Sequence, residues 1–440
     1  MNMQCLLVFT ILCVYLTNAT LKQCYWNDGC SYKYFSSKTS YDAVRGDIRD
    51  AKLGDCEPVS IWHIMRHGPR NPGPDFARKI KTALSYKDDI IKSYEKGNSS
   101  LCAQDVDNLK AYEVPEDMFI YVSKLTEEGY NDMFQIGKRI AQTFPKLVES
   151  LDDGSYEFRA VYGHWIEKSL KAYVEGLAGD KTVNISEVNL SFDNIAPYAA
   201  CGIYQKEVKA NPALYAEVDY YEKTDDYLAA KHRIERRNGL NYDLSGENIT
   251  SLHDLCRYTW SSKEKSSPWC AVFTKEDLEV LEYVGDLRHY YRNSYGHPVN
   301  KLYGGPPLWD LLTTFQLAKD GKGKKVTSYL SHATMMDMIY TALGLYKDEY
   351  PLNGTARVRN RKWRSSFRSG YCANMLAVLN RCSERNSTEF KVAFYLNENP
   401  MTELCDDGIC TWEEFEKLLQ PFIGSKIDLK FCKFMNTRFR

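Results

Sequence analysis

Residues Val59-Ser-Ile-Trp-His-Ile-Met65 run directly into Arg66-His67-Gly68-Pro69-Arg70-Asn71-Pro72, and this junction decides the fold. The first stretch is a short apolar run before a Gly/Pro-rich stretch, which is typical of a buried strand that ends in a loop. In open α/β sheets, ligands bind beyond the carboxyl ends of the strands. The loop therefore brings two arginines and one histidine to the place where a ligand is expected.

The residue types of this loop point to a phosphate ligand. The guanidinium groups of Arg66 and Arg70 can grip phosphate oxygens as forks. His67 lies between them and can attack phosphorus to form a phosphohistidine, while Gly68 lets the backbone approach a ligand closely. We predict a phosphate site with His67 as the nucleophile. The alternatives are that His67 binds phosphate without turnover, or that the stretch is a solvated basic loop.

Strands and helices alternate on both sides of this junction. Apolar runs predict further strands at 156–162, 325–331, 375–379 and 391–396, and Thr126 before two glutamates predicts a helix start. This alternation favours an α/β fold with a doubly wound, mainly parallel sheet flanked by helices and a smaller inserted α-helical domain. The predicted divisions are 1–19 (signal peptide), 20–199 (first part of the α/β domain), 200–310 (helical insertion, or cap) and 311–440 (second part of the α/β domain).

Composition excludes several other classes of protein. The 440 residues are 44% hydrophobic and 13% aromatic, which is too rich for a disordered chain. Lysine and arginine number 57 against 58 acidic residues, so the chain lacks the basic excess of a general nucleic-acid binder. We predict no nucleic-acid partner. No apolar run after residue 19 reaches the length of a transmembrane helix.

The first residues and the cysteines indicate the secretory pathway. An apolar run at 5–16, with small residues before a cleavage after Ala19, is typical of a signal peptide. Twelve cysteines remain, an even number that fits disulfides in an oxidising compartment. Three pairs close in sequence are candidate bridges: Cys24 with Cys30, Cys256 with Cys270, and Cys405 with Cys410. We predict no metal site, because no cysteine or histidine cluster has the spacing of zinc ligands.

Six Asn-x-Ser/Thr sequons fit the same compartment, since the secretory pathway glycosylates such sites on protein surfaces. They are Asn98, Asn184, Asn189, Asn248, Asn353 and Asn386. We predict a secreted or luminal glycoprotein.

The loop at residues 66–72 resembles the Arg-His-Gly-x-Arg-x-Pro signature of the histidine acid phosphatases. Stretches at 125–139, 267–273, 295–300 and 360–365 are most similar to the multiple inositol polyphosphate phosphatases of that family. The resemblance implies metal-free, cofactor-free hydrolysis of phosphomonoesters such as inositol hexakisphosphate, other inositol polyphosphates or 2,3-bisphosphoglycerate. It also implies that His67 is the nucleophile and that Arg66, Arg70 and His332 bind the phosphate.

Two positions depart from the family pattern. The family has a third phosphate-binding arginine six residues after the Arg at the end of the second strand, and here that position is Trp165. The family's acidic proton donor follows the second histidine by one or two residues, where this chain has Ala333 and Thr334. A positioned general acid contributes ~10²–10⁴ in rate, so we expect weak activity. The alternative is a catalytically impaired member that binds phosphorylated ligands.

Other residues could supply the missing groups. His164 or Lys168 could replace the lost positive charge, and Asp337 could serve as a relocated acid. The arginine-rich segment 357–368 could steer polyanions or bind acidic glycans, or could be a solvated helix end and loop. A surface adhesion protein that uses this segment is the third functional hypothesis.

Overall fold

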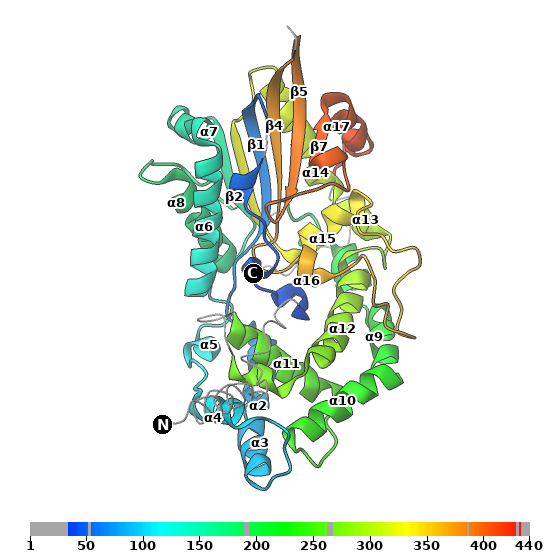
Figure 1. Ribbon diagram of the computed structural model, residues 1–440. Helices are drawn as coiled ribbons and strands as arrows, with labels where there is room; N and C mark the ends of the chain where they lie inside the picture. Colours follow the sequence, from blue (N-terminus) through cyan, green and yellow to red (C-terminus); the bar gives the residue numbers. More distant parts are fainter. Residues whose placement is uncertain are drawn as a thin grey trace, which may run out of the picture.

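The computed structural model describes residues 34–51, 54–188, 193–261, 267–384, 387–427 and 431–432. Within them, one mixed sheet forms the centre of the molecule (Figure 1). Its strands lie in the order β2-β3-β1-β4-β5-β6, and β7 pairs with β5. The strands are β1 Cys56–Arg66, β2 Tyr156–Ala160, β3 Val326–Ser331, β4 Asn374–Glu384, β5 Ser387–Leu396, β6 Asn399–Pro400 and β7 Ile409–Thr411.

The α/β fold class is confirmed, and the sheet combines two strand orientations. β1, β3 and β2 are parallel to one another, whereas β4 is antiparallel to β1 and β5 is antiparallel to β4. The expectation of a mainly parallel sheet therefore holds for the three strands that carry the predicted loop. Arg66 pairs with Ser331, and Ala160 pairs with Leu330. This register brings the carboxyl ends of all three strands to one edge.

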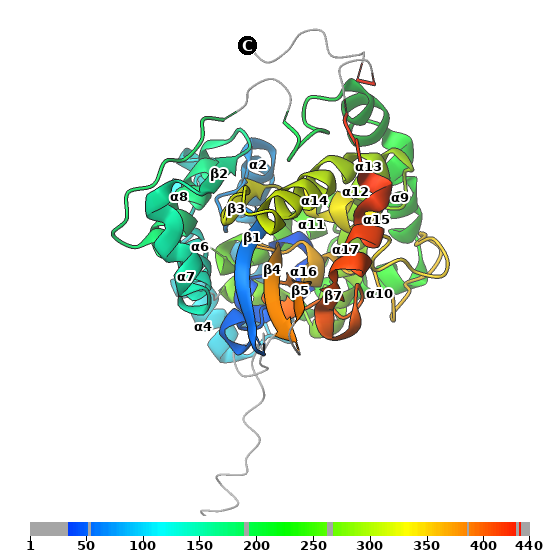
Figure 2. The ribbon, with the colours of Figure 1, turned by 90° about the horizontal axis from the view of Figure 1, so that it is seen from above.

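Helices cover both faces of the sheet, with α6 and α8 on one side and α14 and α17 on the other (Figure 2). Their bounds are α6 Glu127–Thr143, α7 Pro145–Glu149, α8 His164–Ala178, α14 Gly305–Lys319, α15 Ala333–Ala342, α16 Ser365–Arg368 and α17 Trp412–Leu419. The predicted cap of α6 is confirmed, because the Thr126 hydroxyl accepts a hydrogen bond from the Gly129 amide at 3.0 Å. The predicted strands and the helices after β2 and β3 are present as well.

A second group of helices lies beyond the carboxyl edge of the sheet (Figure 1). From the predicted insertion come α9 Ala216–Tyr221, α10 Asp225–Asn238, α11 Gly246–Trp260 and α12 Lys275–Asn293, whereas α13 Val299–Tyr303 packs on α15 and α14. From the segment after β1 come α2 Pro74–Ala83, α3 Tyr86–Glu95, α4 Ala103–Ala111 and α5 Asp117–Ile120. Because α2 packs on α11 and α3 on α10, residues 74–120, which the sequence places in the first part of the α/β domain, lie with the helices of the insertion.

Disulfides join segments that are far apart in the chain as well as near neighbours. The predicted bridges Cys256–Cys270 and Cys405–Cys410 are confirmed. Two long-range bridges that the sequence could not assign, Cys56–Cys382 and Cys201–Cys432, accompany them. Cys102 is disulfide-bonded as well.

Some of the predictions fall on other parts of the chain. Both Cys24 and Cys30 lie outside the described residues, so the bridge from Cys24 to Cys30 is not confirmed and stays a prediction. The predicted signal peptide and the sequons at Asn189 and Asn386 also lie outside them. In the described part of the chain, no helix has the length and apolar character needed to cross a membrane.

Candidate active site

The predicted site residues meet where β1, β2 and β3 end. His67 follows β1 and His332 follows β3, and their ring centroids lie 6.2 Å apart. The first turn of α8, after β2, brings Trp165 to the same place, with its ring 6.2 Å from His67 and 6.5 Å from His332. The parallel register therefore assembles the site from three segments that are far apart in the sequence.

The imidazole of His67 is held in the form that a nucleophile requires. His67 is only 3% exposed, and its Nδ1 lies 2.8 Å from the carbonyl oxygen of Gly68. A carbonyl can only accept a hydrogen bond, so Nδ1 carries the proton and the lone pair remains on Nε2. Burial lowers the pKa of His67 well below its usual value, and the charges of Arg66 and Arg70 lower it further. The ring is therefore neutral at neutral pH.

The two arginines of the loop are fixed by backbone and aromatic contacts. Arg66 is buried, donates to the carbonyl oxygens of Ser37 and Ser369, and lies 4.7 Å from the ring centroid of Tyr371. Arg70 donates to the Asn71 carbonyl at 2.8 Å. Within the described residues, the Nε atoms of both arginines are buried without a hydrogen-bond partner. No acceptor among the described residues takes these two N–H groups, as expected of guanidinium donors that bind an oxyanion.

His332 has a partner that sequence reasoning missed. The Tyr198 hydroxyl lies 2.9 Å from Nδ1 of His332. Burial, followed by the charges of Arg70 and Arg66, lowers the pKa of His332 to about 3. Burial also raises the pKa of Tyr198, so its hydroxyl keeps its proton and can donate it to Nδ1. In that arrangement Nε2 carries hydrogen and can donate to a phosphate oxygen.

Gly68 is required for a different reason from the one its sequence suggested. A Cβ at Gly68 would lie 2.5 Å from the carbonyl oxygen of Gly129, and a Cβ at Gly129 would lie 2.1 Å from the carbonyl oxygen of Pro69. The two glycines therefore let the phosphate loop pack directly on the first turn of α6. This close approach, rather than access of a ligand to the backbone, is what the structure shows at Gly68.

Trp165 occupies the site instead of turning away from it. Its ring lies 5.1 Å from the guanidinium carbon of Arg70, an arrangement of the cation–π type. His164 and Lys168 are exposed and line a separate pocket with Tyr162 and Ile185. Neither of them replaces the third arginine of the family within the group around His67.

The residues after His332 provide no carboxylate beside the histidines. Thr334 is 9% exposed and lies against Tyr204. The proposal of Asp337 as a relocated acid is wrong, because its carboxylate is fully buried toward α12. Its Oδ2 lies 2.8 Å from Nδ1 of His289 and accepts from Asn293 at 3.0 Å. Asp337 is committed to a structural contact.

The arginine-rich segment 357–368 is not a free basic rim. Arg357 is paired with Asp226 and Glu279, and Arg361 with Glu282 and Asp286. Arg364 also contacts Glu282, at 2.7 Å. Acidic residues, most of them on α12, thus neutralise three of these arginines. The glycan-binding hypothesis loses three of the charges on which it depended, while Arg359 and Lys362 remain exposed.

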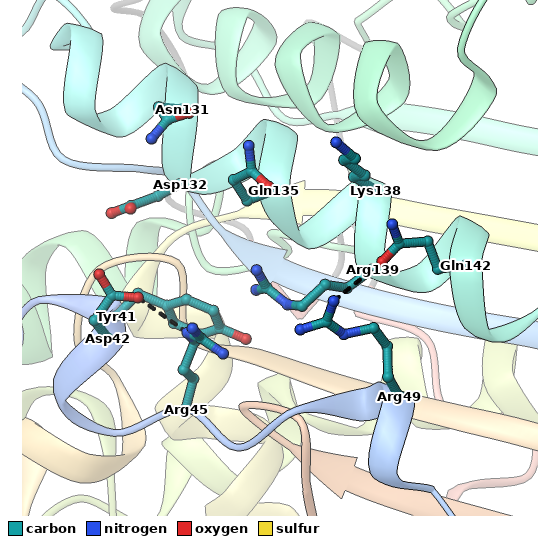
Figure 3. A pocket seen from close by; sticks show the side chains of 10 residues that line it. All are labelled: Tyr41, Asp42, Arg45, Arg49, Asn131, Asp132, Gln135, Lys138, Arg139 and Gln142. Atoms are coloured by element: carbon teal, nitrogen blue, oxygen red, sulfur yellow. Dashed lines mark hydrogen bonds and ion pairs between the residues drawn. The ribbon is translucent and has the colours of Figure 1, made fainter.

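An arginine-lined pocket lies between α6 and the segment 41–49, away from the active site, and its volume is about 330 Å³ (Figure 3). Each arginine that lines this pocket forms an ion pair with a carboxylate. Arg45 contacts Asp42 at 2.9 Å, and Arg49 contacts Asp47 at 2.5 Å. Arg139, which also lines the pocket, forms a bidentate pair with the buried Glu398, at 2.5 and 2.7 Å. We call this region the paired pocket.

Similarity to known proteins identifies the family to which the chain belongs. The model of the histidine phosphatase superfamily (branch 2) matches residues 60–397, so the chain belongs to that family. Within it, the chain is a relative of the multiple inositol polyphosphate phosphatases. It is 30% identical to multiple inositol polyphosphate phosphatase 1 of Drosophila melanogaster over 423 residues, covering 91% of this chain and 88% of the relative. The human protein of the same name is 26% identical, with coverage of 83% and 81%.

Solved structures share the fold. The phytase from D. castellii superposes with a TM-score of 0.73 at 18% identity, covering 96% of this chain and 92% of the phytase. The Bifidobacterium longum multiple inositol polyphosphate phosphatase, in complex with inositol hexasulfate, gives a TM-score of 0.61 at 15% identity, covering 84% and 92%.

Proposed function

We propose that this chain is a secreted histidine phosphatase that hydrolyses inositol polyphosphates, inositol hexakisphosphate foremost, through a phosphohistidine at His67. 2,3-Bisphosphoglycerate is the second substrate class. The observation that carries the proposal is the hydrogen bond from Nδ1 of His67 to the Gly68 carbonyl, because it leaves the Nε2 lone pair free to attack. The names of the relatives support the choice of substrate.

In the first step, Nε2 of His67 forms a bond to phosphorus while the bond from phosphorus to the ester oxygen breaks. Arg66, Arg70 and His332 hold the transferring oxygens and stabilise their charge. The departing oxygen takes a proton from water, because Thr334 cannot act as an acid near neutral pH. In the second step, water attacks phosphorus, the nitrogen–phosphorus bond breaks, and phosphate leaves. We expect the first step to be slow with alkyl esters, since their leaving groups are poor.

A second candidate is a member of the family that binds phosphorylated ligands without turnover. The observations that favour it are the Trp165 ring over Arg70 and the neutral side chain at Thr334.

The proposal of secretion has support of its own. Four disulfides join described residues, as is usual in an oxidising compartment. The sequon asparagines Asn98 and Asn184 are exposed, and Asn248 and Asn353 are partly exposed. We therefore propose that these four are glycosylated. Mass spectrometry of the protein from culture medium, with and without glycosidase, tests both points.

Phosphate release separates the two candidates. We would measure it between pH 4 and 8 from inositol hexakisphosphate and from an activated aryl phosphate, with His67→Ala as the control. Release from both substrates, lost in the variant, supports the phosphatase. Release from the aryl ester alone indicates a retained nucleophile without an acid. Absence of release from either substrate overturns the phosphatase and leaves the binding protein.

A further inference from the structure

A pocket of about 630 Å³ lies between the turn after α15 and the segment 361–368. Its size falls within the range of roughly 300–1,000 Å³ that is usual for small-molecule sites. The charged residues that line it are Lys347, Arg361, Lys362, Arg364, Arg368 and the carboxylate Glu403. We call it the Arg368 pocket. It combines the volume of a ligand site with an excess of positive charge.

The Arg368 pocket is separate from the active site. His332 precedes α15 and Tyr346 follows it, and the ten residues of that helix span about 15 Å. The two regions adjoin through the backbone, because the carbonyl oxygen of Ser369 accepts a hydrogen bond from Arg66 at 2.6 Å. The side chain of Arg368, however, lies over Tyr346, with its guanidinium carbon 3.7 Å from the ring centroid. A ligand of this pocket would therefore occupy a second site.

Arg368 differs from the paired arginines of the same segment. Arg361 contacts both Glu282 and Asp286. Arg368 forms no ion pair with any described residue, and its Nε is buried without a hydrogen-bond partner. Glu403 is exposed and does not pair with it. Because no carboxylate of the described chain compensates the Arg368 charge, an anion in the pocket would be attracted to it.

Other groups of the same pocket also lack partners within the described residues. Lys347 and Lys362 are exposed and form no ion pair there. Tyr346 is 7% exposed, and its hydroxyl is buried without a hydrogen-bond partner. Burial raises the pKa of Tyr346 to about 12, so the hydroxyl keeps its proton and is a donor at neutral pH. Arg364 contacts Glu282 through Nη2, but its Nε has no partner.

We propose that the Arg368 pocket is a second anion site, which binds a phosphate group, either free or on a small organic molecule. The guanidinium fork of Arg368 suits two phosphate oxygens, and the Tyr346 hydroxyl can donate to a third. Lys347 and Lys362 add positive charge at the exposed side of the pocket. The ring of Phe367, which also lines the pocket, offers an apolar surface to an organic group. This inference does not depend on hydrolysis at the active site.

The test measures binding of inorganic phosphate and of phenylphosphonate, a non-hydrolysable analogue of a phosphate monoester, by calorimetry. Arg70→Met is the background, because it weakens binding at the active site and leaves the Arg368 pocket intact. In that background, Arg368→Met should weaken binding of both probes by about 10- to 100-fold, the usual contribution of charge-assisted hydrogen bonds. Tyr346→Phe, which removes only the hydroxyl, should weaken it by about 2- to 10-fold. Arg359→Met is the matched control, since Arg359 is an exposed arginine of the same segment that does not line the pocket; it should change neither affinity.

The two probes distinguish the sources of the phosphate group. Tighter binding of phenylphosphonate than of phosphate, lost in Arg368→Met, supports a small organic phosphate as the ligand. Equal or tighter binding of phosphate, lost in the same variant, supports inorganic phosphate. Affinities that Arg368→Met leaves unchanged overturn the proposal.

A measurement on the unsubstituted protein keeps the proposal testable if Arg368→Met does not fold. Arginines are modified with phenylglyoxal and identified by mass spectrometry, with and without phosphate or phenylphosphonate. Either probe should protect Arg368, whereas Arg359 should react equally in all samples. Equal modification of Arg368 with and without both probes overturns the proposal. Protection of Arg368 and Arg359 together by a sulfated oligosaccharide, with no protection by either probe, indicates an acidic glycan and overturns it as well.

Discussion

The active site and the paired pocket of Figure 3 both gather arginines, but they differ in what surrounds them. In the paired pocket, Asp42, Asp47 and Glu398 each contact one guanidinium. At the active site, Arg66 and Arg70 form no ion pair within the described residues, and their Nε atoms lack partners.

A cluster of arginines therefore does not by itself identify an anion-binding site, because the arginines can be paired with carboxylates of the protein. A guanidinium matched by a carboxylate stabilises the fold and has little left for a ligand, as the arginine-rich segment 357–368 also illustrates. A buried cation without a carboxylate partner destabilises the ligand-free protein. An anion that binds there is attracted to the cation without competition from a carboxylate of the protein. The missing acidic partner is the more informative feature, and it can be seen only in three dimensions.

The largest effect should come from giving the active site the carboxylate that it lacks. Thr334→Glu should raise hydrolysis of inositol hexakisphosphate by ~10²–10⁴-fold, the usual contribution of a positioned general acid. An activated aryl phosphate should gain little, because its leaving group needs no proton. Steady-state rates with both substrates test this, and Thr334→Gln is the control of equal size. An equal gain with both substrates would show that the introduced carboxylic acid does not protonate the leaving group.

Removing a carboxylate from the paired pocket should act on stability instead. Glu398→Gln leaves Arg139 buried without its partner, which should lower the free energy of unfolding by about 3–5 kcal/mol. The double variant Arg139→Met/Glu398→Gln should recover part of that loss. Urea unfolding measures both. A loss below about 1 kcal/mol in the single variant would mean that the pair does not stabilise the fold.

Substitution of one arginine in each region should affect activity differently: the active-site variant should lose activity, and the paired-pocket variant should not. Arg70→Met should lower kcat/KM by ~10²–10³-fold, by analogy with loss of one oxyanion-hole donor. Arg45→Met should leave kcat/KM unchanged and alter stability by less than about 1 kcal/mol, because its pair with Asp42 is exposed. Parallel assays of the two purified variants decide the matter. A comparable loss of activity in both variants would erase the distinction between the regions.

The last expected effect concerns pH. Burial lowers the pKa of His63 to about 4, and the pKa values of His67 and His332 are lowered as well. Unfolded histidines bind protons near about pH 6.5, so below that pH the unfolded state holds more protons than the folded state. The free energy of unfolding should therefore fall between about pH 6.5 and pH 4, by about 1.4 kcal/mol per pH unit for a fully buried histidine such as His63.

Phosphate should offset part of this loss, because it binds only the folded site. Urea unfolding at pH 7, 6 and 5, with and without phosphate, measures both effects. Arg45→Met should respond to phosphate like the unsubstituted protein, and Arg70→Met should respond less. Stability that is constant from pH 7 to pH 5, or an undiminished phosphate response in Arg70→Met, would contradict this expectation.

Much of the fold and half of the site can be predicted from local sequence. The strand before Arg66, the Thr126 cap and the motif around His67 depend on residues close in sequence, where periodicity, capping and side-chain chemistry act directly. The departures at Trp165 and Thr334 can be predicted as well, because the resemblance fixes their spacing. These are the parts of the molecule in which near neighbours in the chain decide the outcome.

The rest depends on contacts between distant segments. Tyr198 reaches the site through packing, and nothing in its own surroundings in the sequence marks it. The arginines of segment 357–368 suggested a basic surface, because the α12 carboxylates that contact Arg361 precede it by 75 and 79 residues. Asp337 is close to His332 in sequence, but the direction of its carboxylate is set by α12.

The Cys201–Cys432 disulfide determines at what stage of synthesis the segment near Tyr198 can be fixed in place. Cys201 lies three residues after Tyr198, the partner of His332, and its bond partner follows 231 residues later in the chain. A ribosome therefore completes every strand of the described sheet before this loop can be tied down. We expect a nascent chain to contain both His67 and His332 long before they are arranged as in the folded active site. The capacity to handle phosphate esters would then appear only after synthesis has passed residue 432 and an oxidant has acted on the product.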